Sequence, residues 1–411
     1  MKQTHCRACG AALSRTFVDL GLSPLANSFV PVSRADEPEI FYPLHVFVCE
    51  SCFLVQLEAQ EAPENIFSDE YAYFSSYSSS WLEHADRYTQ AMIARFGLGP
   101  GSHVAEVASN DGYLLQWFLQ RGIPVTGIEP AANCASVAIG KGIETECVFF
   151  GATTANDIAQ RRGRADLVAA NNVLAHVPDL KDFLGGFREI LKPQGVATFE
   201  FPHLKNLIAF NQFDTIYHEH FSYLALRPLQ RVLEEQGLRI FDVEELSTHG
   251  GSLRVFVCHQ KAGYQQEPSV ELVLRGEEAA GLTDFACYDS YAQRVVAVKD
   301  ALLDFLIAAR REGKSVCGYG APAKGNTLLN YCGVGPEYIP FTVDRNPGKQ
   351  NTLLPGTRIP VLAVEEIARR KPDYILILPW NLRDEITSQM SFIREWGGRF
   401  VTAVPTIEVS P

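Results

Sequence analysis

Two Cys-x-x-Cys pairs, Cys6 with Cys9 and Cys49 with Cys52, constrain the fold of this 411-residue chain more than any other feature. Each pair brings two thiolates within reach of one ion, and four sulfurs in a tetrahedral array suit Zn²⁺ better than a hard cation. A strand over residues 44–48 would deliver the second pair. The spacing therefore predicts a Cys₄ zinc site in a ribbon-like N-terminal fold; four ordinary buried or redox-active thiols are the alternative.

The predicted zinc is structural. Four sulfur ligands leave no open position for water or a substrate, whereas a catalytic zinc usually keeps one. The remaining cysteines stand singly, without the spacing of a disulfide framework, which indicates reduced thiols in a reducing compartment. The chemistry of the chain must therefore lie outside the cysteine pairs.

Length and charge narrow the class of protein. The chain exceeds a single common core, which predicts two or three domains. It has no run of about 18 apolar residues that would span a bilayer and no apolar signal segment at its start, so we expect a cytoplasmic location and no membrane partner. A net charge of −12 argues against a nucleic-acid partner. The expected state is a monomer or a weak homodimer.

A strand, turn and helix pattern begins the central part of the chain. The apolar strand 103–108 runs through the turn Ser109–Gly112 into a helix at 113–119, an arrangement that places a ligand at the helix N-terminus. The next strand, 124–128, ends at Glu129, where a carboxylate can hold the two hydroxyls of a ribose. This pattern predicts a nucleoside site.

Further strands extend this pattern into a sheet. Strands at 165–170 and 196–201 alternate with helices, which predicts a parallel sheet covered on both faces, with the ligand at the carboxyl ends of the strands. Two more strands, 238–244 and 252–258, are separated by a glycine turn and suit an antiparallel edge. The fold class is therefore α/β.

A second nucleotide-like unit follows near the C-terminus. Strand 315–317 leads into the loop Gly318–Gly325, whose backbone amides can cradle a pyrophosphate. It is not a P-loop, because Lys324 precedes the last glycine where a P-loop has Gly-Lys-Ser or Gly-Lys-Thr. Strand 338–343 ends at Asp344, about 20 residues beyond the glycines, as in NAD-binding folds. A simple packing turn is the alternative for the loop.

The order of the central motifs resembles class I S-adenosylmethionine-dependent methyltransferases. The resemblance rests on Glu106–Gly112, Glu129–Pro130, Asn171–Asn172 with His176, and Leu191–Gly195. Where those enzymes commonly carry Gly-x-Gly, this chain has only Gly112, so a single glycine must permit the backbone to approach the methionyl part of the donor.

The flanking motifs narrow the resemblance to the sugar C-methyltransferases, which add a carbon branch to nucleotide-linked 4-keto deoxysugars. The zinc pairs and the motifs at 71–77, 108–112, 217–223 and 318–325 occur in one order, so the resemblance covers essentially the whole chain. It implies a zinc-binding domain with a connector (1–70), a methyltransferase domain (71–260) and a Rossmann-like sugar-nucleotide-binding domain (261–411). It also implies S-adenosylmethionine and structural Zn²⁺ as cofactors and a nucleotide sugar as the substrate.

This chemistry needs a base, because a ring carbon must become a carbanion before it can accept a methyl group. A histidine near Tyr217 can accept a proton at neutral pH, and Tyr217 can hydrogen-bond the enolate oxygen. Glu219 can orient an imidazole or shuttle a proton. Local sequence does not choose between His218 and His220; the resemblance favours His220. A metal-binding pair or a polar surface turn are the alternatives.

The resemblance also implies roles for individual residues in catalysis, cofactor binding and substrate binding. The reactive sugar is lined by Tyr217, His176 and Tyr71, which with Glu219 and His220 form the catalytic set. The cofactor set is Glu106, Ser109, Asn110, Asp111, Gly112, Glu129, Pro130 and Asn171. The substrate set is Asn172, Tyr217, Gly320, Ala321, Lys324, Asn326, Thr327, Asp344 and Asn346, with the glycine loop on the diphosphate and the Asp344 region on the nucleoside. His176 and the asparagines can instead be structural residues at a strand end, and Tyr71 can be core packing.

The expected reaction is methyl transfer to a ring carbon, C3, next to the ketone of a TDP-linked 4-keto-deoxysugar. The alternative is an NAD-linked or non-enzymatic nucleotide-sensing zinc protein, because both nucleotide-like units also suit those functions.

Overall fold

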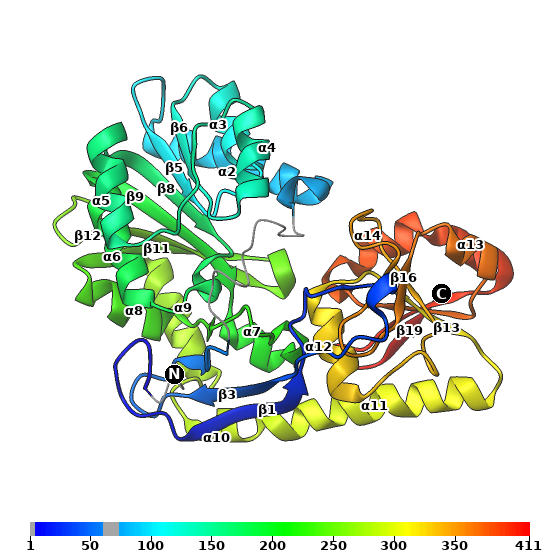
Figure 1. The fold of residues 1–411 in the computed structure, drawn as a ribbon. Coiled ribbons are helices and arrows are strands. Elements are labelled where there is room, and N and C mark those ends of the chain that lie inside the picture. Colours follow the sequence, from blue (N-terminus) through cyan, green and yellow to red (C-terminus); the bar gives the residue numbers. More distant parts are fainter. Residues whose placement is uncertain (1–4, 61–73) are drawn as a thin grey trace. The chain divides into compact units, whose positions relative to one another are not determined.

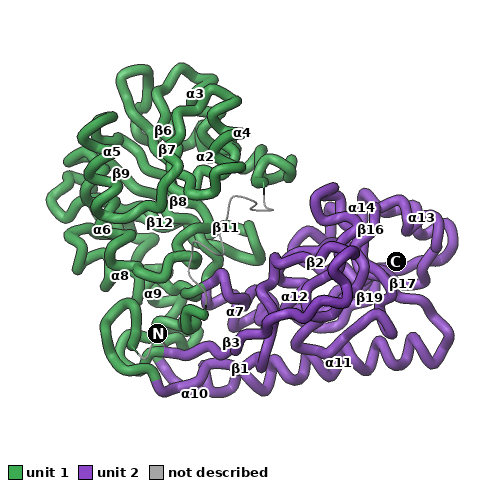
Figure 2. Tube along the Cα trace, in the orientation of Figure 1, with its two compact units in different colours: residues 1–13, 49–203, 221–283 green, residues 14–48, 204–220, 284–411 purple. Residues whose placement is uncertain are grey.

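The computed structural model describes residues 5–60 and 74–411. Over these two ranges, no helix combines the length and the apolar character needed to cross a membrane. The chain forms two compact units, each assembled from three stretches: 1–13, 49–203 and 221–283 in unit 1, and 14–48, 204–220 and 284–411 in unit 2 (Figure 2). The units thus interleave along the chain, and the linear boundaries at residues 70 and 260 stay a prediction.

Unit 1 contains a seven-stranded sheet with the order β11-β12-β9-β8-β5-β6-β7 (Figure 1). Its strands are β5 (Val104–Val107), β6 (Val125–Ile128), β7 (Thr145–Glu146), β8 (Ala165–Asn171), β9 (Leu191–Pro202), β11 (Leu238–Leu246) and β12 (Ser252–His259). Strands β5 to β9 pair in parallel, and β12 and β11 close one edge antiparallel. The predicted parallel sheet with an antiparallel edge is confirmed.

Helices cover both faces of this sheet because the side chains of its strands alternate between two apolar layers. Val104 and Leu167 face one layer, whereas Ala105 and Val168 face the other. The first layer is covered by α2 (Ser79–Phe96), α3 (Leu115–Gln120) and α4 (Ala132–Gly140); the second is covered by α5 (Ala152–Arg162), α6 (Leu180–Ile190), α8 (Leu226–Glu235) and α9 (Pro268–Ala279). Short 3-10 turns η2 (Ser75–Tyr77), η3 (Leu174–His176) and η5 (Thr248–Gly250), and the strand pair β4 (Val55–Leu57) with β10 (Ser222–Tyr223), complete unit 1.

Unit 2 contains an eight-stranded sheet with the order β19-β18-β17-β13-β14-β16-β15-β2. Its strands are β2 (Val30–Pro31), β13 (Val316–Tyr319), β14 (Thr342–Val343), β15 (Thr352–Leu353), β16 (Pro360–Leu362), β17 (Tyr374–Ile377), β18 (Arg399–Thr402) and β19 (Glu408–Ser410). The five strands from β18 to β16 are parallel, and β19, β15 and β2 are antiparallel to their neighbours. The predicted Rossmann-like α/β sheet is confirmed.

Three predicted boundaries in unit 2 are wrong. Strand β13 continues to Tyr319, so the glycine loop begins at Gly320. Helix α12 (Ala323–Cys332) begins inside the predicted loop, so Lys324 lies in the first turn of a helix. Strand β14 keeps only two residues, because Pro340 lacks the N–H that a sheet ladder requires.

The N-terminal strands β1 (Arg15–Ser23) and β3 (Tyr42–Val48) form an antiparallel pair that belongs to unit 2. Phe17 stacks on Tyr291 at 4.5 Å between ring centroids and meets Tyr288 edge-on at 6.0 Å. These tyrosines belong to α11 (Tyr291–Arg311) and to α10 (Phe285–Asp289). The unit also has α7 (Leu204–Ala209), α13 (Glu366–Arg370), α14 (Arg383–Gln389), η1 (Val32–Arg34), η4 (Phe213–Thr215), η6 (Trp380–Leu382) and η7 (Ser391–Trp396).

Candidate active site

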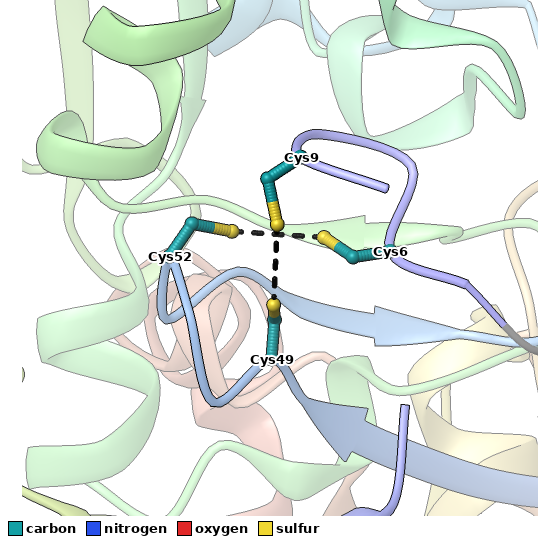
Figure 3. A group of neighbouring side chains, drawn as sticks. All are labelled: Cys6, Cys9, Cys49 and Cys52. Atoms are coloured by element: carbon teal, nitrogen blue, oxygen red, sulfur yellow. Dashed lines mark hydrogen bonds between the residues drawn. The ribbon is translucent and has the colours of Figure 1, made fainter. Parts of the chain in front are cut away.

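The four cysteine sulfurs come together at one point (Figure 3), all within 4.8 Å of one another. Within the cluster, the sulfur of Cys6 lies 3.6 Å from that of Cys52, and the sulfur of Cys9 lies 3.5 Å from that of Cys49. Each knuckle closes by a backbone hydrogen bond to its first cysteine, because residues with positive φ, Gly10 and Phe53, turn their N–H groups back onto the carbonyls of Cys6 and Cys49. The predicted Cys₄ cluster is confirmed.

This cluster suits a zinc ion held by four thiolates. Gln56 supports it from outside, since its Nε2 donates to the Cys6 sulfur at 3.1 Å and its Oε1 accepts from the Arg7 N–H at 3.0 Å. Such a donor to sulfur stabilises the thiolate form. Three of the four cysteines are buried in the apolar core that α5, α6, α8 and α9 share with the sheet. The metal site is therefore part of the folding core of unit 1.

The loop after β5 turns sharply through backbone conformations that most residues avoid. Ala108, Asn110 and Gly112 all have positive φ, at 57°, 50° and 78°. A side chain on Gly112 would bring its Cβ to 2.4 Å from Ile143 Cδ1, so the glycine is required both by its φ and by packing. The structure thus gives Gly112 a packing role that the sequence did not predict.

Glu129, directly after β6, ties this loop to the start of α4. Its Oε2 accepts from the Asn110 N–H at 2.8 Å and its Oε1 accepts from the Ala131 N–H at 2.9 Å. Burial raises the pKa of Glu129, and these two backbone donors act in the opposite direction. Because each carboxylate oxygen has two lone pairs, a bound ribose can still donate to it.

Asp344 in unit 2 is held in the same way as Glu129. Its Oδ2 accepts from the Ala321 N–H in the loop after β13 at 2.7 Å, and its Oδ1 accepts from the Asn346 N–H at 2.8 Å. In both units, a carboxylate that directly follows a strand accepts one hydrogen bond from a backbone N–H in the loop after the neighbouring strand. It accepts a second hydrogen bond from the backbone N–H two residues further along the chain. Both acids are thus positioned where a Rossmann-type sheet holds a ribose.

Buried polar atoms gather at the carboxyl ends of β5 and β8. Among the described residues, the buried atoms there with no hydrogen-bond partner include Ser109 Oγ and Asn172 Oδ1, whereas Glu106 and Asn171 both interact with the Tyr113 hydroxyl. Burial raises the pKa of Glu106 well above its usual range, and an interaction with Tyr113 acts in the opposite direction. Buried polar groups are normally paired. Their concentration beside β5, where the strand order of the sheet reverses, marks a ligand site.

The Tyr217–His220 segment forms a tight turn in unit 2. The His220 N–H donates to the Tyr217 carbonyl at 2.9 Å, and the two rings lie 3.9 Å apart between centroids. The His220 Nδ1 lies 2.8 Å from the Thr215 carbonyl oxygen. Since a carbonyl can only accept, Nδ1 carries the proton and Nε2 of the neutral ring carries the lone pair. His220 is therefore held in the tautomer that a base using Nε2 requires.

His218 has different surroundings. It is 3% exposed, its Nε2 donates to the Pro43 carbonyl at 3.2 Å, and Tyr42 meets its ring edge-on at 5.8 Å. Burial lowers the pKa of His218, and the carbonyls of Pro43 and Tyr42 act in the opposite direction. These contacts fit a structural histidine that fastens the turn to β3.

Glu219 is buried beside a lysine that sequence reasoning missed. Its Oε1 accepts from Asn27 Nδ2 at 2.7 Å, and Lys349 interacts with it electrostatically. Burial raises the pKa of Glu219 to about 7, while Asn27 and Lys349 act in the opposite direction. Lys349 also donates to the Ala321 carbonyl at 2.9 Å, so it connects the glycine loop with the Tyr217–His220 turn.

The start of α12 supports the segment that carries the turn. Thr327 Oγ1 donates to the Ile216 carbonyl at 2.8 Å, and Asn326 Nδ2 donates to the Ala26 carbonyl at 2.6 Å. Both side chains are almost fully buried. Asn326 and Thr327, predicted as substrate ligands, therefore have support roles that the sequence did not reveal.

Lys324 lies among side chains that sequence reasoning also missed. Its Nζ donates to Asn381 Oδ1 at 2.7 Å and lies 4.6 Å from the centre of the Trp380 ring, whose Nε1 donates to the buried Asp214 at 2.6 Å. Loss of solvation lowers the pKa of Lys324, and Asp214 acts in the opposite direction. Burial raises the pKa of Asp214 to about 6. No local motif marks these residues, because Asp214 belongs to η4 whereas Trp380 and Asn381 belong to η6, far away along the chain.

Two other predicted residues have simple positions. His176 is half-buried and ends η3, where its N–H donates to the Val173 carbonyl at 2.8 Å, and Pro130 directly follows Glu129. Tyr71 lies outside the described residues.

Comparison with known proteins decides the family. Family models match a zinc binding domain over residues 6–67, a methyltransferase domain over 81–243 and a C-methyltransferase C-terminal domain over 247–405. The C-methyltransferase NovU of Streptomyces niveus is 38% identical over 401 residues, which cover 98% of this chain and 95% of NovU. The chain belongs to the C-methyltransferase family.

This C-methyltransferase depends on S-adenosylmethionine and has a Cys₄ zinc-binding domain, as the sequence predicted. The match to this family contradicts the alternative of an NAD-linked or non-enzymatic nucleotide-sensing protein. A ubiquinone biosynthesis O-methyltransferase of Rhodopseudomonas palustris is 32% identical over 97 residues, which cover 23% of this chain and 38% of that protein. Among solved structures, magnesium protoporphyrin IX methyltransferase from Synechocystis PCC 6803 with bound SAM is 16% identical to this chain, with a TM-score of 0.34. The match covers 48% of this chain and 88% of that protein.

The raised pKa of Glu219 predicts a pH-dependent stability for the C-methyltransferase. The folded carboxyl holds its proton up to about pH 7, whereas the unfolded one loses it near 4.5, so the contribution of Glu219 to stability is fully present below 4.5 and is lost as the pH rises to 7. The Glu219→Gln variant should lack this loss and gain about 3 kcal/mol relative to wild type between pH 4.5 and 8. Denaturant unfolding at both pH values measures it.

The matched control is Glu83→Gln, which changes an exposed glutamate of α2. This variant should follow the wild-type pH dependence. An equal pH dependence of wild type and Glu219→Gln would show that Glu219 is ionised throughout the range.

Proposed function

We propose that this C-methyltransferase moves the methyl group of S-adenosylmethionine onto C3 of a TDP-linked 4-keto-deoxysugar, with His220 as the base. The observation that carries the proposal is the hydrogen bond from His220 Nδ1 to the Thr215 carbonyl, which leaves the lone pair on Nε2. Family membership supports carbon as the methylated atom. The identity of the sugar, the nucleotide attached to it and the ring carbon that receives the methyl group are our proposal.

Unit 1 would hold the methyl donor. Glu129 would accept from the ribose hydroxyls, and the loop Ser109–Gly112 would approach the methionyl part. Glu106 and Asn171, which both interact with the Tyr113 hydroxyl, keep further lone pairs that a ligand amino or hydroxyl group can satisfy. The bound donor supplies an electrophilic methyl group on sulfur.

Unit 2 would hold the nucleotide sugar. The loop Gly320–Ala321 and the ammonium of Lys324 suit a diphosphate, because a lysine can neutralise phosphate charge at a helix start. The ammonium of Lys349, which donates to the Ala321 carbonyl, adds a second positive charge at the same loop. Asp344 would accept from the nucleoside, as Glu129 would from the donor.

The reaction then follows from the acceptor chemistry. His220 Nε2 takes the proton from the carbon next to the ketone, and the electron pair of that C–H bond forms the enolate. Tyr217 would donate to the enolate oxygen, since its ring lies against that of His220. The enolate carbon bonds the methyl carbon as the C–S bond breaks, and S-adenosylhomocysteine and a methylated ketone are the products. Glu219, with a pKa of about 7, can exchange a proton near neutral pH.

The test incubates the protein with S-adenosylmethionine and a panel of TDP-4-keto-deoxysugars, with mass spectrometry for a methylated sugar nucleotide and for S-adenosylhomocysteine. We expect both products in equal amounts, and NMR should place the new methyl on C3. A product methylated on oxygen or nitrogen, or at any carbon other than C3, would contradict the proposal. A matched panel of the corresponding 4-hydroxy sugars should give no product, because those sugars cannot form an enolate.

A further inference from the structure

Arg7 lies between the two cysteines of the first knuckle and reaches away from the metal site. It is 7% exposed, and its guanidinium donates to backbone carbonyls from three separate parts of unit 1. Nε donates to Pro178 O at 3.2 Å, Nη1 donates to Leu57 O at 3.0 Å, and Nη1 also donates to Phe221 O. The rigid fork of an arginine can hold several carbonyls in fixed directions, which the single ammonium of a lysine cannot do.

Two of these carbonyls belong to the chain beside candidate active-site histidines. Phe221 follows His220 by one peptide bond, and Pro178 stands two residues after His176. The same stretches are joined directly, because the Phe221 N–H donates to the Ala175 carbonyl at 2.7 Å.

Several contacts hold both the backbone and the side chain of Phe221. Its carbonyl accepts from the Leu57 N–H at 3.0 Å in addition to Arg7, its ring is fully buried, and the Arg7 guanidinium lies 5.5 Å from the centre of that ring. Leu57 belongs to β4, a few residues after the second cysteine pair, and β4 pairs with β10, which begins just after Phe221. The backbone that leaves the Tyr217–His220 turn is thus fastened at its first residue.

The backbone of Arg7 is held in place by contacts of the first knuckle. The Arg7 N–H donates to Gln56 Oε1, and the same amide donates through Nε2 to the Cys6 sulfur. A continuous set of contacts therefore runs from the Cys₄ cluster through Gln56 and Arg7 to Phe221.

We propose that Arg7 is a positioning residue, through which the Cys₄ knuckle holds the backbone that carries His220 and His176. This inference rests on the proposed function, in which His220 is the base. It gives the zinc-binding domain a role in catalysis without placing the metal near the reacting atoms. A displacement of a base by about 1 Å can lower the rate about 100-fold.

The test compares Arg7→Met and Arg7→Lys with a matched control, Arg239→Met. Arg239 also uses its guanidinium to hold three backbone carbonyls in unit 1, those of Gln260, Ala262 and Tyr264, but that loop carries no candidate active-site residue. The readouts are zinc content, the affinity for S-adenosylmethionine by calorimetry, kcat, and hydrogen exchange of the peptides covering 175–178 and 217–223.

We expect kcat to fall about 100-fold in Arg7→Met, with zinc content and donor affinity unchanged and with faster hydrogen exchange at both peptides. Arg7→Lys should recover part of the rate. Arg239→Met should melt at a lower temperature but keep its kcat.

Three results would overturn the inference: wild-type kcat in Arg7→Met, an equal loss of kcat in Arg239→Met, or loss of zinc from both Arg7 variants, which would assign Arg7 to the metal site alone. Failure of the proposed function is distinguishable, because it would appear as full activity of a His220 variant while the exchange of residues 217–223 still responds to Arg7.

Discussion

Replacing His220 by asparagine is expected to lower kcat about 10³-fold while the affinity for S-adenosylmethionine stays unchanged. The variant loses the nitrogen that would take the proton from carbon. Asparagine retains a side-chain N–H that can donate to the Thr215 carbonyl, so the turn should keep its shape. The donor ligands proposed in unit 1 come from other stretches of the chain and are not altered. Mass spectrometry of the products and calorimetry of donor binding measure the two effects separately.

The matched control for this variant is His218→Asn, two residues earlier in the same turn. His218 is buried against Pro43 and Tyr42, so its loss should lower the melting temperature and leave kcat within about threefold, because catalytic effects of a missing base are much larger. Exchange of the sugar C3 proton with deuterated solvent, measured without the methyl donor, should disappear only in His220→Asn. Turnover of that variant at the wild-type rate would remove His220 as the base.

Loss of the metal is expected to unfold the N-terminal part of unit 1. Removing zinc by a chelator, or replacing Cys49 by serine, disrupts metal–sulfur bonds. In small zinc domains, zinc binding contributes on the order of 10 kcal/mol to the free energy of folding. The effect should spread beyond the knuckles, because Cys6, Cys49 and Cys52 share one apolar core with helices of the methyltransferase sheet. Melting followed by circular dichroism, with zinc measured on the same samples, tests this.

The control variant is Cys147→Ser, which changes an exposed thiol outside the cluster and should melt as wild type does with one zinc per chain. Unchanged melting of the protein after verified removal of the metal would show that the cysteine cluster does not hold the fold. Activity alone would not separate this effect from damage to the active site, so the melting temperature is the primary readout.

Features set by short-range sequence patterns were predictable. The Cys-x-x-Cys spacing predicted a cluster that the structure confirms, because a knuckle is closed by its own backbone. The sequence also predicted a strand that ends at Glu129, and the structure has β6 end at Ile128, directly before this residue. Both results depend on residues whose positions follow from a regular strand, turn and helix unit.

Features set by contacts between distant residues were not predictable. The difference between His218 and His220 comes from Pro43, 175 residues away from His218. The support roles of Asn326 and Thr327 come from Ala26 and Ile216, and no spacing rule connects those positions. Lys349 stands in a loop without a motif, although it reaches both the glycine loop and Glu219.

The interleaved course of the chain limits how this enzyme can be re-engineered. Each compact unit draws on three separate stretches, so the backbone passes from one unit to the other five times. No single contiguous gene fragment therefore encodes either unit. Transplanting unit 2, in which we propose the nucleotide-sugar site, from a relative requires exchanging residues 14–48 and 204–220 together with residues 284–411. A chimaera joined at one point near residue 284 would combine strands and helices that never evolved to pack against each other.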